Sequence, residues 1–60
     1  MNNFGFIVKE TRKKKNLKQR EVAEAMTVTP SYISKVESGK EIPTEMFKKL
    51  FFILYPFEGD

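Results

Sequence analysis

The 60-residue sequence contains no cysteine and no histidine. Disulfide bonds and the usual thiolate or imidazole zinc sites are therefore excluded, so stability has to come from apolar packing or from a partner chain. The sequence also lacks a glycine-rich phosphate-binding loop and any cluster of residues typical of metal ligands. We therefore expect a protein that is not an enzyme and that binds neither a cofactor nor a metal.

Long apolar runs are missing as well. The longest, residues 50–55, is far shorter than the roughly 20 residues that span a membrane. The first residues lack the basic start and long apolar stretch of a signal peptide. These features predict a cytoplasmic protein with no membrane partner. Residues 1–60 correspond to one small domain, near the lower size limit for a chain that folds alone.

Basic residues, in contrast, are concentrated in one segment. Residues 9–20 contain seven Lys and Arg side chains and one Glu, a charge of +6, whereas the whole chain carries +3. A lopsided basic segment favours a polyanionic partner, and nucleic acid is the commonest polyanion inside a cell. Lysines at the negative pole of a helix dipole explain the same pattern. Charge alone leaves both interpretations open.

Apolar spacing predicts a first helix over residues 3–15 and a second over residues 19–26. Phe4, Ile7, Val8 and Thr11 follow an i, i+3, i+4, i+7 pattern, which places them on one helical face. Asn16 ends the first helix because asparagine tolerates the left-handed conformation found at helix ends. In the second helix, Val22, Ala23 and Met26 form the inner face, with the small Ala23 where the helices cross.

Capping signals predict two further helices. Thr29 is a good N-cap, Pro30 suits the first helical position, and Gly39 ends this third helix. The fourth helix covers about residues 44–55, beginning at Thr44. Its expected inner face consists of Phe47, Leu50, Phe51 and Leu54, with Met46 beside them. No stretch alternates apolar and polar residues over the length of a strand, so we expect an all-α fold.

Residues 19–38 thus form two short amphipathic helices joined by a tight turn. This is the pattern of a helix-turn-helix, which places its second helix in the major groove of DNA. The pattern indicates a protein that binds double-stranded DNA in a sequence-specific manner.

The same region carries a family resemblance. The residues that carry it are Arg12, Leu17-Lys18-Gln19, Val22-Ala23, Val28-Thr29, Tyr32-Ile33-Ser34, Glu37-Ser38-Gly39-Lys40 and Pro43. Over residues 4 to about 54, the sequence resembles the helix-turn-helix domain of the phage Cro and C1 repressors and the Xre-like regulators. The resemblance implies a compact, lambda-repressor-like four-helix domain, reduced from five helices, and a repressor-like regulator of transcription. It also implies a buried ion pair between Arg12 and Glu37.

The resemblance also implies DNA contacts. The base-reading residues that it implies are Pro30, Ser31, Ser34 and Lys35, and it implies a phosphate contact for Gln19. From their chemistry and place in the chain, the further expected phosphate contacts are Lys18, Thr29, Tyr32 and Lys40. Lysine reaches guanine O6 and N7, serine bonds base edges, and proline offers only apolar contact. Because few of these groups form bidentate bonds, we expect modest direct readout supplemented by DNA shape.

Two positions depart from the family pattern. Lys18 stands where relatives prefer a Ser or Thr N-cap, and lysine cannot accept the amide hydrogen bonds of a helix start. A phosphate contact and a tolerated poor cap both explain it. Thr27 replaces the usual glycine in the turn between the second and third helices. A β-branched residue resists the positive φ that this turn often needs, so we expect the turn to be built differently.

Apolar residues near the end of the chain exceed what two inner helical faces bury. Such clusters usually mark interfaces, and the candidates are Phe52, Ile53, Tyr55 and Phe57, with Phe6 nearby. We expect a homodimer that binds a palindromic operator, with half-sites about 34 Å apart. Three alternatives remain open. The apolar face binds another protein, as in an antitoxin-like regulator; Phe57 folds back over the core; or the 60 residues are the DNA-binding part of a longer protein.

Overall fold

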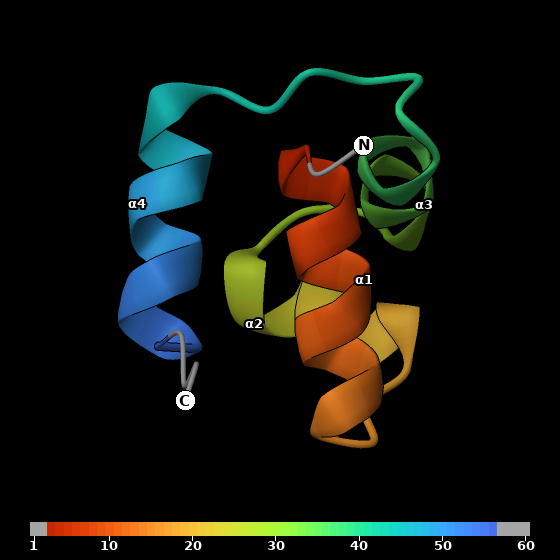
Figure 1. Cartoon of the computed structure of the whole chain (residues 1–60), viewed down its shortest axis with the longest axis vertical. Coiled ribbons are helices and arrows are strands. Elements are labelled where there is room, and N and C mark those ends of the chain that lie inside the picture. Colours follow the sequence, from red (N-terminus) through yellow and green to blue (C-terminus); the bar gives the residue numbers. More distant parts are fainter. Residues whose placement is uncertain (1–2, 57–60) are drawn as a thin grey trace.

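The computed structural model describes residues 3–56 and contains four α-helices (Figure 1). They are α1 (Phe4–Lys14), α2 (Gln19–Met26), α3 (Pro30–Ser38) and α4 (Glu45–Leu54). This part of the chain contains no strand, so the prediction of an all-α, four-helix fold is confirmed. None of the helices in residues 3–56 is long and apolar enough to cross a membrane.

Local capping signals explain where three of these helices begin. The side-chain oxygens of Asn3, Thr29 and Thr44 each accept a hydrogen bond from the backbone N–H three residues later, at 2.9–3.1 Å. Pro30 occupies the first position of α3, and Gly39 ends that helix with φ 82°. Because these signals are local, the sequence places the helix ends correctly to within about one residue.

The start of α2 is formed differently. Lys18 occupies the N-cap position, and its side chain accepts no capping hydrogen bond. The carboxylate of Glu21 instead accepts a hydrogen bond of 2.7 Å from the backbone N–H of Lys18. This is the reciprocal half of a capping box, and its negative charge also suits a helix start. Glu21 therefore compensates for a residue that caps poorly.

The helices enclose one small core, with α3 in contact with both α1 and α2. α4 packs against α2 and stands at one side of the molecule, joined to α3 by a loop that passes over the top of α1 (Figure 1). The buried side chains are Val8, Val22, Ala23, Met26, Ile33, Val36, Phe47 and Phe51. Full burial of a Val, Leu, Ile, Phe or Met side chain contributes about 1.5–3 kcal/mol, so these few residues supply most of the stability.

The inner face of α4 is narrower than the sequence predicts. Phe47 and Phe51 are buried, but Leu50 and Leu54 are exposed, and Met46 is 79% exposed. The prediction that Leu50 and Leu54 face the core is therefore wrong, and Met46, expected beside that face, points away from it. α4 packs on one side only, where the ring of Phe4 lies 6.1 Å from that of Phe47 and 5.5 Å from that of Phe51. Only one stripe of the helix reaches the core.

The turn between α2 and α3 has the left-handed residue that the family pattern requires. Thr27 adopts φ 61° and ψ 44°, and the N–H of Val28 donates to the carbonyl oxygen of Ala23 at 2.9 Å. The expectation of a differently built turn is therefore wrong. The surrounding hydrogen bonds and the packing of Val28 against the core hold Thr27 in a conformation that its branched side chain disfavours.

Replacing Thr27 with glycine should therefore stabilise the fold. The left-handed conformation costs a residue with a Cβ about 1–2 kcal/mol, and glycine loses roughly 0.5–1 kcal/mol through its freer unfolded state. We expect Thr27→Gly to raise the free energy of unfolding by about 0.5–1 kcal/mol in urea titrations. Asn16→Gly is the matched control, since Asn16 has φ 60° but tolerates it better. A loss of stability in Thr27→Gly would show that the backbone of Thr27 is not strained in the folded protein.

Candidate nucleic-acid interface

One side of α3 presents a continuous polar surface to solvent. Its opposite side is buried through Ile33 and Val36, which anchor the helix in the core. The exposed residues include every one to which sequence analysis assigns base reading, together with the N-cap: Thr29, Pro30, Ser31, Ser34 and Lys35. The face consists of small side chains with a single cation, so the helix backbone can approach a flat or grooved partner closely.

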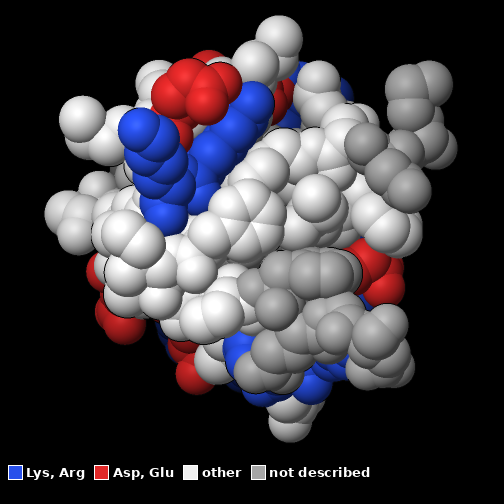
Figure 2. All heavy atoms as spheres, turned by 60° about the vertical axis from the view of Figure 1, so that its left-hand side comes forward, with Lys and Arg blue, Asp and Glu red and all other residues white. Residues whose placement is uncertain are grey.

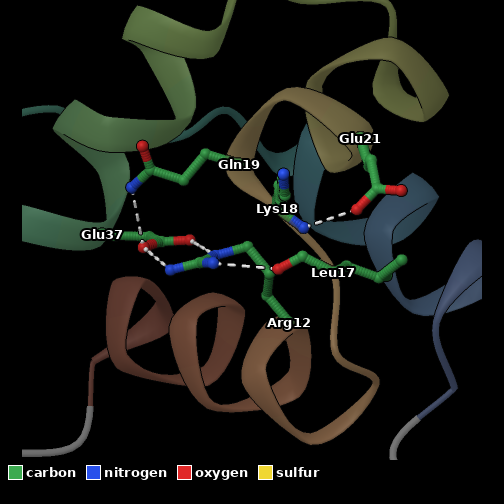
Figure 3. A network of polar contacts seen from close by, with 6 residues as sticks. All are labelled: Arg12, Leu17, Lys18, Gln19, Glu21 and Glu37. Carbon is green, nitrogen blue, oxygen red and sulfur yellow. Dashed lines mark hydrogen bonds and ion pairs between the residues drawn. The ribbon is translucent and has the colours of Figure 1, made fainter.

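Arg12 and Glu37 form an ion pair that joins α1 to α3. The Nε of Arg12 lies 2.8 Å from Oε2 of Glu37, and its Nη2 lies 3.1 Å from Oε1 (Figure 3). The two side chains are only 15% and 5% exposed. The hydrogen bond with Glu37 raises the pKa of Arg12, burial opposes this rise, and the charge of Glu37 adds to it. Arg12 therefore remains protonated throughout the pH range of ordinary measurements.

The same network reaches the start of α2. The Nη1 of Arg12 donates to the carbonyl oxygen of Leu17 at 3.0 Å, directly before the helix. The Nε2 of Gln19 donates to Oε1 of Glu37 at 3.1 Å (Figure 3). The sequence pattern predicts a DNA phosphate contact for Gln19 but gives no sign of this bond. The network fixes the first turn of α2 relative to the last turn of α3.

The remaining predicted phosphate contacts lie at the start of α2, within α3 and directly after α3. Lys18 and Lys40 are exposed, whereas Tyr32 is half-buried with its ring 5.4 Å from that of Phe47. The position of Lys40 is well defined, because the backbone N–H groups of Lys40 and Glu41 both donate to the carbonyl oxygen of Lys35, at 2.8 and 3.1 Å. Lys40 thus follows the exposed face of α3 without an intervening flexible segment.

The residues expected at a dimer interface differ in their surroundings. Ile53 is 72% exposed, whereas Tyr55 is half-buried against Phe51, and burial and then the charge of Glu21 raise the pKa of its hydroxyl. Phe52 is partly exposed, with its ring edge-on to that of Phe4 at 5.6 Å. Phe57 lies outside the described residues. The largest apolar exposures, at Met46 and at Ile42 in the preceding loop, were not predicted.

Comparison with known proteins agrees with this geometry. A family model described as helix-turn-helix matches residues 8–51. The ImmF control region 10 kDa protein of Bacillus phage phi105 is 40% identical over 41 residues, which cover 68% of this chain and 46% of the phage protein. The chain thus spans about half the length of this curated relative. No solved structure matches. The chain belongs to the Cro/C1-type helix-turn-helix family of DNA-binding regulators.

Proposed function

We propose that this protein regulates transcription as a repressor-like factor that inserts α3 into the major groove of a specific DNA sequence. The observation that carries the proposal is the open polar face of α3, beside the anchored start of α2. A helix of this kind reads bases while the preceding helix contacts the backbone. The phage relative, described as a control region protein, supports a regulatory role.

Within this proposal, Lys35 is the principal base-reading residue. It is the cation of the exposed α3 face and can donate to O6 and N7 of a guanine. Ser31 and Ser34 can bond neighbouring base edges, and Pro30 can contact a thymine methyl group. Because short side chains contact few base atoms, the shape of the DNA supplies part of the specificity.

Phosphate contacts supply the remaining affinity. Lys18 and Lys40 are exposed at the start of α2 and after α3, and Thr29 lies at the amino end of α3, where backbone N–H groups attract anions. Gln19 and Tyr32 add uncharged hydrogen-bonding groups. Contacts of this kind fix the register of the protein on DNA without reading its sequence.

We propose that two copies bind together through α4. Met46, Leu50 and Ile53 are exposed and follow an i, i+4, i+7 spacing, so they form one apolar stripe. Among the described residues, Figure 2 shows an uncharged area on this side of the molecule, with lysine and acidic side chains towards the edge. A second copy covers the stripe and doubles the DNA contact, which favours a palindromic operator. The alternative is that a different protein binds the same apolar stripe.

Selection of bound sequences from a random DNA pool tests the proposal. We expect a palindromic motif with a guanine in each half-site. Lys35→Ala should weaken binding to that motif by about tenfold more than binding to unrelated duplex, since one good base contact contributes roughly 1–3 kcal/mol of discrimination. Lys9→Ala removes an exposed lysine from α1, outside α3 and α4, and serves as the matched control. Equal losses on both DNAs would contradict base reading by Lys35, and an unsymmetrical motif would contradict the dimer.

A further inference from the structure

The carboxylate of Glu37 is almost completely enclosed and accepts hydrogen bonds from two residues. Arg12 donates from Nε and Nη2, and Gln19 donates from Nε2. The ion pair with Arg12 accounts for the stability of the arrangement but not for the presence of Gln19, which lies on the first turn of α2. A side-chain amide that is hydrogen-bonded to a buried carboxylate is held in one orientation. A ligand that binds beside the first turn of α2 therefore meets the amide in that orientation.

Glu37 determines which way the amide of Gln19 faces. A glutamine side chain has a donor end and an acceptor end, whereas an ionised carboxylate only accepts. Only the nitrogen of Gln19 can therefore face Glu37, and Figure 3 shows the amide oxygen turned away. The nitrogen carries a second hydrogen. Among residues 3–56, that hydrogen has no acceptor.

From this geometry we infer that Glu37 is a positioning residue, which holds the amide of Gln19 ready to donate its second N–H to a DNA phosphate. The inference rests on the proposed function, because it needs DNA beside the start of α2. A phosphate, like a carboxylate, only accepts hydrogen bonds, so an amide turned the other way would present the wrong atom. A glutamine fixed in advance also loses less side-chain freedom on binding.

Arg12 contributes to the same arrangement in two ways. Its guanidinium neutralises Glu37, so the carboxylate does not repel an approaching phosphate. Its Nη1 also binds the carbonyl oxygen of Leu17, which fixes the backbone directly before Lys18 and Gln19. The first turn of α2 is therefore held through its backbone and through the side chain that faces DNA.

A double-mutant cycle on DNA binding tests this role. The variants are Gln19→Leu, the pair Arg12→Met with Glu37→Met, and the combination of all three. Removing Arg12 and Glu37 together leaves the net charge unchanged and strands neither charge in the interior. Affinity for a generic duplex is measured at low salt by fluorescence anisotropy, and circular dichroism verifies that each variant is folded.

We expect Gln19→Leu to weaken binding about tenfold in the native background, the effect of one hydrogen bond to a charged group. In the doubly substituted background the same change should cost less than about twofold, because the amide has already lost its orientation. Equal factors in the two backgrounds, or no loss in the native one, would overturn the positioning role. Failure of the unmodified protein to bind any duplex would overturn the proposed function instead.

A measurement on the unmodified chain makes the test independent of the variants. Gln19 is the one glutamine of the sequence, so labelling with ¹⁵N-glutamine gives a single pair of side-chain amide proton signals. We expect one proton to be shifted downfield in the free protein by its bond to Glu37, and the other to shift when duplex is added. Two unperturbed signals in the presence of DNA, while the backbone signals at the start of α2 move, would refute the inference.

Discussion

Replacing Arg12 with alanine should lower the free energy of unfolding by about 3–5 kcal/mol, because it leaves the carboxylate of Glu37 buried without its counter-ion. The side chain of Glu37 is 5% exposed, so water cannot replace the lost partner without a rearrangement of α1 and α3. A 60-residue domain has a total stability of roughly 3–9 kcal/mol. At the lower end of this range the variant would be largely unfolded at 25 °C, and at the upper end it would lose about half its stability; circular dichroism and urea titration measure the loss.

The matched control replaces both members of the pair. Substituting Arg12 and Glu37 together with methionine removes the same interactions but strands no charge, and such exchanges are often neutral or stabilising. We expect this double variant to unfold within about 1 kcal/mol of the unmodified chain. If Arg12→Ala costs less than about 1 kcal/mol, Glu37 is hydrated in solution, and the enclosed ion pair does not describe the folded state.

The sequence predicts the helices well because their ends are encoded locally. Thr29 with Pro30, Thr44 and Gly39 act within one turn of the chain, so no knowledge of the tertiary structure is needed. The packing of α4 is not local. Apolar residues occupy several sides of this helix, and the pattern does not state which side meets α2 and which remains exposed at Met46 and Ile53.

In the candidate site too, features encoded by nearby residues could be predicted, whereas contacts between distant residues could not. The exposure of Ser31 and Lys35 follows from the helical period and the buried positions of Ile33 and Val36, so it could be predicted. The bond between Gln19 and Glu37 could not, because its members are 18 positions apart and glutamine binds a carboxylate and a phosphate equally well. Family resemblance supplied the pairing of Arg12 with Glu37 but gave no reason to connect Gln19 to it.

Gly5 is a structural requirement that the sequence pattern alone does not reveal. It is buried in the first turn of α1, where that helix approaches the last turns of α3. A Cβ at this position would lie 3.1 Å from the carbonyl carbon of Val36 and 3.3 Å from Cα of Glu37, and it would overlap the carbonyl oxygen of Val36. All three atoms belong to the backbone of α3, so no side chain can move aside to make room.

Gly5→Ala should therefore destabilise the fold by about 3 kcal/mol, near the upper end of the usual cost of overpacking. Helix propensity alone predicts the opposite sign, a gain of roughly 1 kcal/mol for alanine over glycine. Urea titration of this variant thus distinguishes close packing from local preference by the direction of the change. The displacement of α1 should also separate Arg12 from Glu37, and a weakened affinity for generic duplex in the remaining folded protein would reveal it.

Gly39→Ala is the control that separates contact from conformation. Gly39 has φ 82°, but a Cβ there would meet no atom within 4 Å. Its replacement should cost only the strain of a left-handed alanine, about 1–2 kcal/mol, and should leave the ion pair intact. A smaller loss for Gly5→Ala than for Gly39→Ala would mean that α1 and α3 are farther apart in solution than described. Since Arg12 and Glu37 join these two helices, their bidentate geometry depends on the same close approach.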